Sequence, residues 1–157
     1  MCLLRTARVL PLFLLALAAV PLPARAEELS LDDRALLKQV EDEALPHQRD
    51  RINIACGIQA MLSIDTASVT SHDAILDLDG QGMDALASAL EHVCASDIGK
   101  QAVAAKIKTL VLVNKAHTAE RGLHLKDGVL ELDGAWGMGR DGYLEDSEIE
   151  AELNKLL

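Results

Sequence analysis

The N-terminus constrains this chain more than any other stretch, because it removes residues from the fold and sets the compartment. Arg5 and Arg8 precede an apolar run of twelve residues, Val9–Val20, and an A-x-A site follows at residues 24–26. This order is typical of a secretory signal peptide, and the run is too short to span a bilayer as a helix. We therefore predict that residues 1–26 are cleaved and that the chain is exported by the general secretory route, to the periplasm or outside the cell.

Cleavage would leave residues 27–157, which are 131 of the 157 residues. This length suits one domain with a single core. We expect residues 27–157 to form that single domain.

The cysteines predict one covalent cross-link. Cys2 leaves with the leader, so Cys56 and Cys94 remain as a pair in an exported chain, and oxidising compartments favour disulfides. Redox pairs normally have Cys-x-x-Cys spacing, and a closed zinc site needs four ligands, of which His92 and Cys94 supply only two. We therefore predict a Cys56–Cys94 disulfide.

The charge balance narrows the choice of partners. The chain carries 15 Lys and Arg against 25 Asp and Glu, a net charge of −10 at pH 7. Three of the arginines lie in the leader, so the exported part would carry 12 basic and 25 acidic side chains, or −13. Such a field repels phosphate backbones, which argues against nucleic acid, and it attracts cations. We expect an unknown protein partner of basic character, and no membrane insertion after cleavage.

Several segments have apolar residues at helical spacing. Ser30 precedes the first, Leu31 to about Leu45, which Pro46 should end or kink. Gly57 suits the end of a short second helix over residues 46–56, although residues 52–64 also alternate as a strand would. Residues 66–81 are polar and predict a loop with a short turn around 74–76. Further helices are expected at residues 82–94, at 98–106 with Ser96 or Asp97 as cap, and at 144–157 with Asp146 or Ser147 as cap.

The clearest local structure is a C-terminal β-hairpin. Asp127-Gly128 is a preferred dipeptide of the two-residue type I′ turn. Folding there sets Leu125 opposite Leu130 and Leu123 opposite Leu132, with His124 opposite Glu131 on the other face. Strands at about residues 58–64 and 106–114 bring the total to about four. We predict an α+β fold, with a small, mainly antiparallel sheet packed against several helices on one face.

The glycine-rich stretch Gly137–Glu148 partly matches two ligand-binding loops. Its first three glycines have dinucleotide-loop spacing, but only one helix follows in the sequence, so no strand–helix–strand unit closes. Asp141 and Glu148 fit positions 5 and 12 of a calcium-binding EF-hand loop, whose positions 1 and 3 are then glycines without side-chain oxygens.

A second stretch fails in the opposite half of the same motif. Asp77 and Asp79 fit the first two ligand positions, but Ser88 stands where a bidentate glutamate belongs. Weak calcium binding through one of these degenerate loops stays open as an alternative. We predict no cofactor.

Trp136 and Tyr143 are the two aromatic residues of the exported part, since Phe13 lies in the leader. Two alternatives are open for Trp136 in its glycine-rich connector. It folds back to cap the core, or it is an exposed interaction anchor with Tyr143 beside it. Two aromatic rings cannot build much of a stacking platform for sugars or single strands.

No local motif predicts a catalytic centre. The sequence lacks G-x-S-x-G, H-E-x-x-H and S-x-x-K patterns, its histidines are scattered, and paired cysteines leave no thiol nucleophile. A triad assembled in space stays open, because triads are defined by geometry and not by order in the chain. We therefore expect a small exported acidic domain that works by non-enzymatic binding. The alternatives are a small hydrolase-type enzyme with an unrecognised site and a weak calcium binder.

Overall fold

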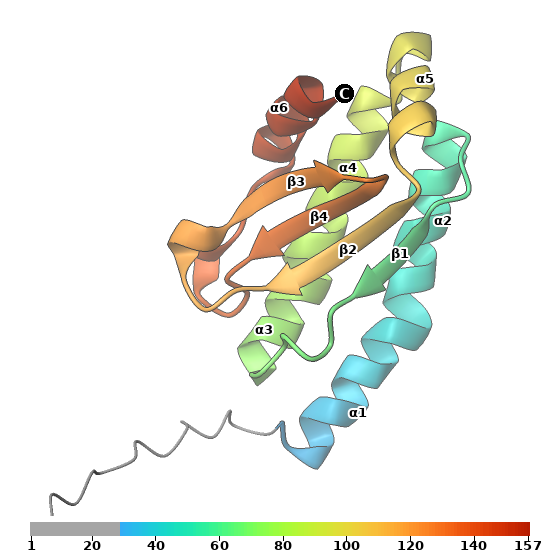
Figure 1. Ribbon diagram of the computed structural model, residues 1–157. Helices are drawn as coiled ribbons and strands as arrows, with labels where there is room; N and C mark the ends of the chain where they lie inside the picture. Colours follow the sequence, from blue (N-terminus) through green and yellow to red (C-terminus); the bar gives the residue numbers. More distant parts are fainter. Residues whose placement is uncertain (1–28) are drawn as a thin grey trace, which may run out of the picture.

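The computed structural model describes residues 29–157, so the leader predicted at residues 1–26 lies outside the described residues. Helical segments precede, interrupt and follow a four-stranded sheet (Figure 1). The elements are α1 (Leu31–Gln39), η1 (Val40–Ala44), α2 (Leu45–Cys56), β1 (Met61–Ile64), α3 (His72–Asp77), η2 (Leu78–Gly82), α4 (Met83–Val93), α5 (Asp97–Lys106), β2 (Thr109–Asn114), η3 (Thr118–Glu120), β3 (Gly122–Lys126), β4 (Val129–Gly134), η4 (Gly139–Gly142) and α6 (Asp146–Leu156).

The sequence predicted that Pro46 ends or kinks the first helix, and the structure does not end it there. Ser30 caps α1 as predicted, and the chain continues through the wider π-helical turn η1 into α2, where Pro46 occupies the first turn. A proline has no N–H to donate, and a π-helical turn changes the hydrogen-bond spacing just before it. The predicted helix over residues 46–56 is confirmed, and Gly57 ends it at φ 66°.

The segment predicted as a polar loop, residues 66–81, is largely helical. Ser71 caps α3, and η2 joins α3 to α4 without a break. Ala74, Ile75 and Leu78 are buried, so the segment does have an apolar face, which the aspartates and glycines around it concealed. The helices predicted at 82–94 and 98–106 are confirmed within a residue or two, the latter with Ser96 as cap.

The sheet is mixed, so the prediction of a mainly antiparallel sheet is wrong. Its strand order is β1-β2-β4-β3, with β1–β2 and β2–β4 parallel and only β3–β4 antiparallel. The helices between β1 and β2 carry the chain back to the end where β1 began, which makes these neighbours parallel. The hairpin then places its second strand, β4, beside β2.

The hairpin itself is confirmed in every predicted pair. Leu125 faces Leu130, Leu123 faces Leu132 and His124 faces Glu131. Asp127 and Gly128 have φ of 52° and 86°, as a type I′ turn requires. The turn chemistry and the leucine pattern were sufficient because both are local.

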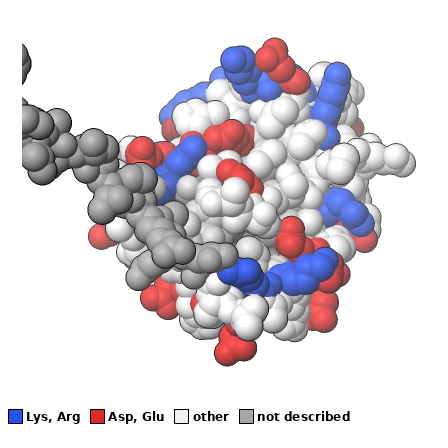
Figure 2. Space-filling model, turned by 60° about the horizontal axis from the view of Figure 1, so that its bottom comes forward, with Lys and Arg blue, Asp and Glu red and all other residues white. Residues whose placement is uncertain are grey.

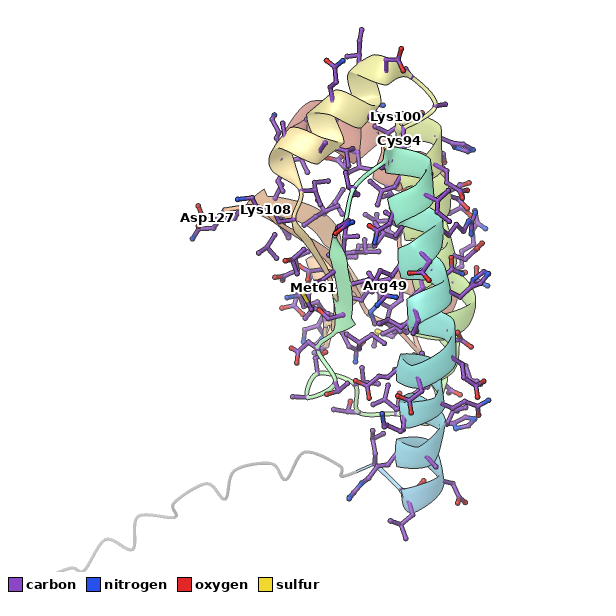
Figure 3. All side chains as sticks on the ribbon, turned by 90° about the vertical axis from the view of Figure 1, so that its right-hand side faces the viewer. Arg49, Met61, Cys94, Lys100, Lys108 and Asp127 are labelled. Carbon is purple, nitrogen blue, oxygen red and sulfur yellow. A yellow bond between two sulfur atoms is a disulfide. The ribbon has the colours of Figure 1, made fainter. Side chains whose placement is uncertain are left out.

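Among residues 29–157, helices cover one face of the sheet and leave the other uncovered (Figure 1). Leu62, Leu110 and Leu132 point from successive strands into the helical side and are buried. Met61 lies on the opposite side of β1 from the long N-terminal helix (Figure 3). The described residues therefore form a two-layer α+β fold. No helix among residues 29–157 is long and apolar enough to cross a membrane.

The predicted disulfide is present. Cys56 at the end of α2 and Cys94 just after α4 are bonded across a separation of 38 residues, and each is 2% exposed. The bridge ties together the ends of the two longest covering helices, next to the core residue Leu90.

Candidate functional site

A polar pocket of about 290 Å³ lies between the N-terminal half of α4 and the connector that leads from β4 to α6. Two segments far apart in the sequence line it. Gly80, Gln81, Asp84, Ala85 and Ser88 form one wall, and Arg140, Tyr143, Glu145 and Asp146 form the other. Parts of the two stretches that resembled halves of a calcium loop line these walls, but none of the four candidate ligands Asp77, Asp79, Asp141 and Glu148 does.

Arg51 on α2 forms hydrogen bonds with side chains of the α4 wall of the pocket. Its guanidinium donates to Asp84 at 2.6 Å, to Ser88 Oγ at 3.0 Å and to both oxygens of Glu91 at 2.7 Å. The hydrogen bond with Glu91 is the main reason that the pKa of Arg51 is raised and the pKa of Glu91 is lowered. Asp84 and Ser88 are four residues apart and share one face of the helix, which is why one arginine reaches both.

Backbone hydrogen bonds to side chains fix the connector. Asn114 Oδ1 accepts from the Trp136 N–H at 2.9 Å, and Asp77 Oδ2 accepts from the Gly137 N–H at 2.9 Å. Gly137 has φ 91°, and a Cβ there would lie 2.9 Å from the backbone nitrogen of Ala74. Only glycine therefore allows the connector to lie this close to α3.

Trp136 takes the core-capping alternative and is not an exposed interaction anchor. It is 3% exposed, and its indole lies against Gly82 and Gly134, where an added Cβ would come within 2.8 and 2.5 Å of ring carbons. Its ring stacks on Tyr143 with centroids 6.4 Å apart. Tyr143 is half-buried and lines the pocket, so the stack fixes one aromatic wall of the site.

The carboxylates of two of the four calcium candidates accept backbone hydrogen bonds. Asp77 accepts the Gly137 hydrogen bond, and Asp79 is exposed on η2. The carbonyl of Asp141 accepts from Arg121, while the Glu148 carboxylate accepts from the Glu145 N–H in a capping box at the start of α6. Glu145, not Asp146 or Ser147, is thus the cap of this helix. Among residues 29–157 there is no group of three His, Cys, Asp or Glu side chains arranged to hold a metal ion.

A second polar cluster lies on the uncovered face of the sheet. Asp133 on β4 is 4% exposed, and Lys115 Nζ lies 3.1 Å from its Oδ1 and 3.3 Å from Glu131 Oε1. His124 Nε2 lies 3.3 Å from Asp133 Oδ2, and its ring lies over Gly122, where a Cβ would come within 3.2 Å.

Burial dominates the electrostatics of this cluster. It disfavours the charged carboxylate and raises the pKa of Asp133, with Glu131 adding to the rise and Lys115 opposing it. Asp133 in turn raises the pKa of Lys115, so the ammonium stays charged and occupies the place between the two carboxylates. The sequence predicted only the His124–Glu131 pairing, because Lys115 comes from a different strand end.

Neither place pairs a hydroxyl or thiol nucleophile with a histidine or lysine base. The pocket lining offers the hydroxyls of Ser88 and Tyr143 but no histidine or lysine to act as their base, and Ser88 accepts from Arg51. The sheet cluster has one histidine and two carboxylates, but no serine, threonine or cysteine takes part in its contacts. Both arrangements suit ion pairing better than nucleophilic chemistry.

No family model, curated protein or solved structure matches this chain. The geometry and charge of the pocket and of the sheet cluster are therefore the basis for inferring a function.

Proposed function

We propose that the chain is a small exported binding domain that holds a cationic side chain of a protein partner in the pocket between α4 and the connector. The observation that carries the proposal is the pocket lining itself. It combines the carboxylates of Asp84, Glu145 and Asp146 with one arginine, so its fixed charge is negative.

The lining suits an ammonium or guanidinium group. Asp84 pairs with Arg51 and Glu145 pairs with Arg140, yet the two acidic side chains remain 57% and 42% exposed. Tyr143 adds an aromatic face, and cations bind favourably over such faces. Ion pairs at a partly exposed site contribute modest energy, so specificity for a partner also needs the shape of the pocket.

The charge of the whole chain supports the same class of partner. A net charge of −10 steers cations toward the protein and accelerates encounter with a basic segment. The disulfide supports export as well, since such bonds persist mainly in oxidising compartments. Mass spectrometry of the exported chain tests that part. We expect an N-terminus at Glu27 and a mass two hydrogens below that of the dithiol.

Binding is tested with a fluorescent tetra-arginine peptide, followed by anisotropy in low and moderate salt. We expect the Asp84→Asn/Asp146→Asn double variant to weaken binding about 10-fold, as loss of roughly 1.4 kcal/mol predicts. Asp97→Asn, compared with each single variant Asp84→Asn and Asp146→Asn, is the charge-matched control, because Asp97 is also an acid in the first turn of a helix but lies outside the pocket.

The control should change the dissociation constant by less than about 2-fold, the range of a surface ion pair. A tetra-glutamate peptide should not bind. Equal weakening by Asp97→Asn, or binding that survives the double variant, would assign the effect to net charge alone and would reject the pocket.

A further inference from the structure

We propose that the uncovered face of the sheet pairs with the same face of a second copy of this chain, forming a two-fold dimer. The open face is defined by the strand positions that point away from the helices. These are Met61, Ser63, Thr109, Val111, Val113, Gly122, His124, Lys126, Val129, Glu131 and Asp133.

The strand arrangement is the first observation. β1, β2 and β4 run parallel, and sheets made wholly of parallel strands occur almost only with both faces covered, although the antiparallel β3 makes this sheet mixed. Among residues 29–157, helices cover one face (Figures 1 and 3). The open side of the three parallel strands is therefore the part of the sheet that favours a second layer.

The open face also carries exposed apolar side chains. Met61, Thr109 and Val129 stand side by side on β1, β2 and β4, and the two apolar residues of this row are 69% and 37% exposed. Val111 and Val113 continue the apolar area along β2 and are half-buried. Burying such a contiguous area against an equivalent surface is favourable.

The charge of the open face favours a second copy over a basic partner. Lys126 and Glu131 on the open face, with Lys115 and Asp133, give two positive and two negative charges, so the face is neutral when His124 is neutral. Residues 29–157 carry 12 basic and 23 acidic side chains, so the whole net charge of −11 lies elsewhere on the described part.

Two acidic molecules meet with least repulsion through this neutral face. A lysine and a glutamate on one self-complementary surface also allow cross-pairing in an isologous dimer. A basic partner would instead be drawn to the acidic surface outside the open face. Figure 2, which brings the lower end of the molecule in Figure 1 forward, shows acidic and basic side chains together on that end.

The size of the face sets the expected strength. Four strands about 4.8 Å apart and about five residues long cover roughly 19 by 17 Å. This footprint of about 320 Å² per copy is less than half of the roughly 800 Å² that each partner buries in a standard specific interface, so the dimer should be weak and reversible. We therefore expect a dissociation constant on the order of 10–100 µM, not a permanent dimer.

Sedimentation equilibrium of the exported, oxidised protein tests the proposal at about 10 to about 500 µM, a range that brackets this constant. We expect a reversible monomer–dimer equilibrium that strengthens between about 50 and about 500 mM NaCl, because salt screens the repulsion between the acidic bodies. Met61→Glu should weaken the dimer at least about 10-fold. Ile54→Glu is the matched control, because Ile54 is 83% exposed on α2 and lies outside the open face.

A protein that stays monomeric over this range at both salt concentrations overturns the inference. A dimer that Ile54→Glu dissociates and Met61→Glu leaves intact also overturns it, since the interface then lies on the helices. The salt dependence separates this proposal from the peptide-binding pocket, because binding of tetra-arginine must weaken in the same salt that strengthens the dimer.

Discussion

Reducing the Cys56–Cys94 bond gives a direct measure of what holds this small core together. The bridge closes a loop with a sequence separation of 38 residues. In the chain-entropy model such a loop lowers the entropy of the unfolded chain by about 13 cal/mol/K, which is roughly 3.9 kcal/mol at 25 °C. Domains of this kind have a net stability of about 5–15 kcal/mol, so the bridge supplies a large share of it.

The assay is urea unfolding of the same protein with the bond intact and reduced. Reduction keeps both sulfurs in place, so it removes the bond without creating the cavity that alanine substitutions would leave. We expect a loss of about 3–4 kcal/mol, a melting temperature lower by roughly 10–16 °C, and a larger urea m-value because the reduced unfolded chain is more open. A loss below about 1 kcal/mol, with both thiols shown to be alkylated in the unfolded state, refutes the reasoning.

Three further predictions concern Asp133, Lys115 and the connector. Lys115→Met leaves Asp133 buried without its cation and should cost about 3–5 kcal/mol in urea unfolding, whereas Lys115→Arg should cost far less. Burial raises the pKa of Asp133 above 3.8, so the folded state binds the proton of the Asp133 carboxyl more tightly than the unfolded state does. The stability that this protonation contributes is full below pH 3.8 and is lost as pH rises through the folded pKa. The unfolding free energy of the wild type minus that of Asp133→Asn should therefore fall with rising pH, and a flat or rising difference contradicts this assignment. In Gly137→Ala the new Cβ sits at a residue of positive φ and close to the Ala74 backbone, so the substitution should cost about 2–4 kcal/mol of stability. Gly139→Ala should cost about 1 kcal/mol, because a Cβ there has open space. Equal melting temperatures for the two variants would argue against the packing of the connector on α3.

Local chemistry in the sequence predicted local structure well. The Asp127-Gly128 turn fixed the hairpin register, Ser30 and Ser96 marked helix starts, and Gly57 marked a helix end. Each of these depends on residues within one turn or one strand pair. The disulfide was also predictable, because the expected loss of Cys2 with a leader leaves two cysteines and few alternatives.

Non-local pairing was beyond the sequence argument. Nothing in the local pattern of β4 indicates that it lies beside β2 and runs parallel to it. Residues 66–81 were misassigned because their buried face consists of only a few residues among aspartates and glycines. In that segment tertiary burial of Ile75 and Leu78 outweighs weak intrinsic helix propensity.

The candidate site was partly predictable for the same reason. Tyr143 was singled out, and it does line the pocket, but its opposite wall comes from α4, some sixty residues earlier in the chain. The buried ion pair of Lys115 and Asp133 gave no sequence signal. A lysine after one strand and an aspartate at the end of another look like ordinary surface residues until the parallel register places them together.

The distribution of charge links the two proposed surfaces. Acids in the first turns of helices stabilise those helices, so Asp84, Asp146 and Glu148 contribute to the fold as well as to the negative potential near the pocket. Strands are not stabilised by acids in this way, and on their open face the charges of Lys115 and Lys126 balance those of the two carboxylates. Helix capping therefore makes one side of this α+β fold attractive to cations, while the sheet side is left neutral enough to meet a copy of itself. Neutralising Asp84 and Asp146 should therefore weaken peptide binding by removing carboxylates from the pocket. The same substitutions should strengthen self-association, because they lower the negative charge of each copy.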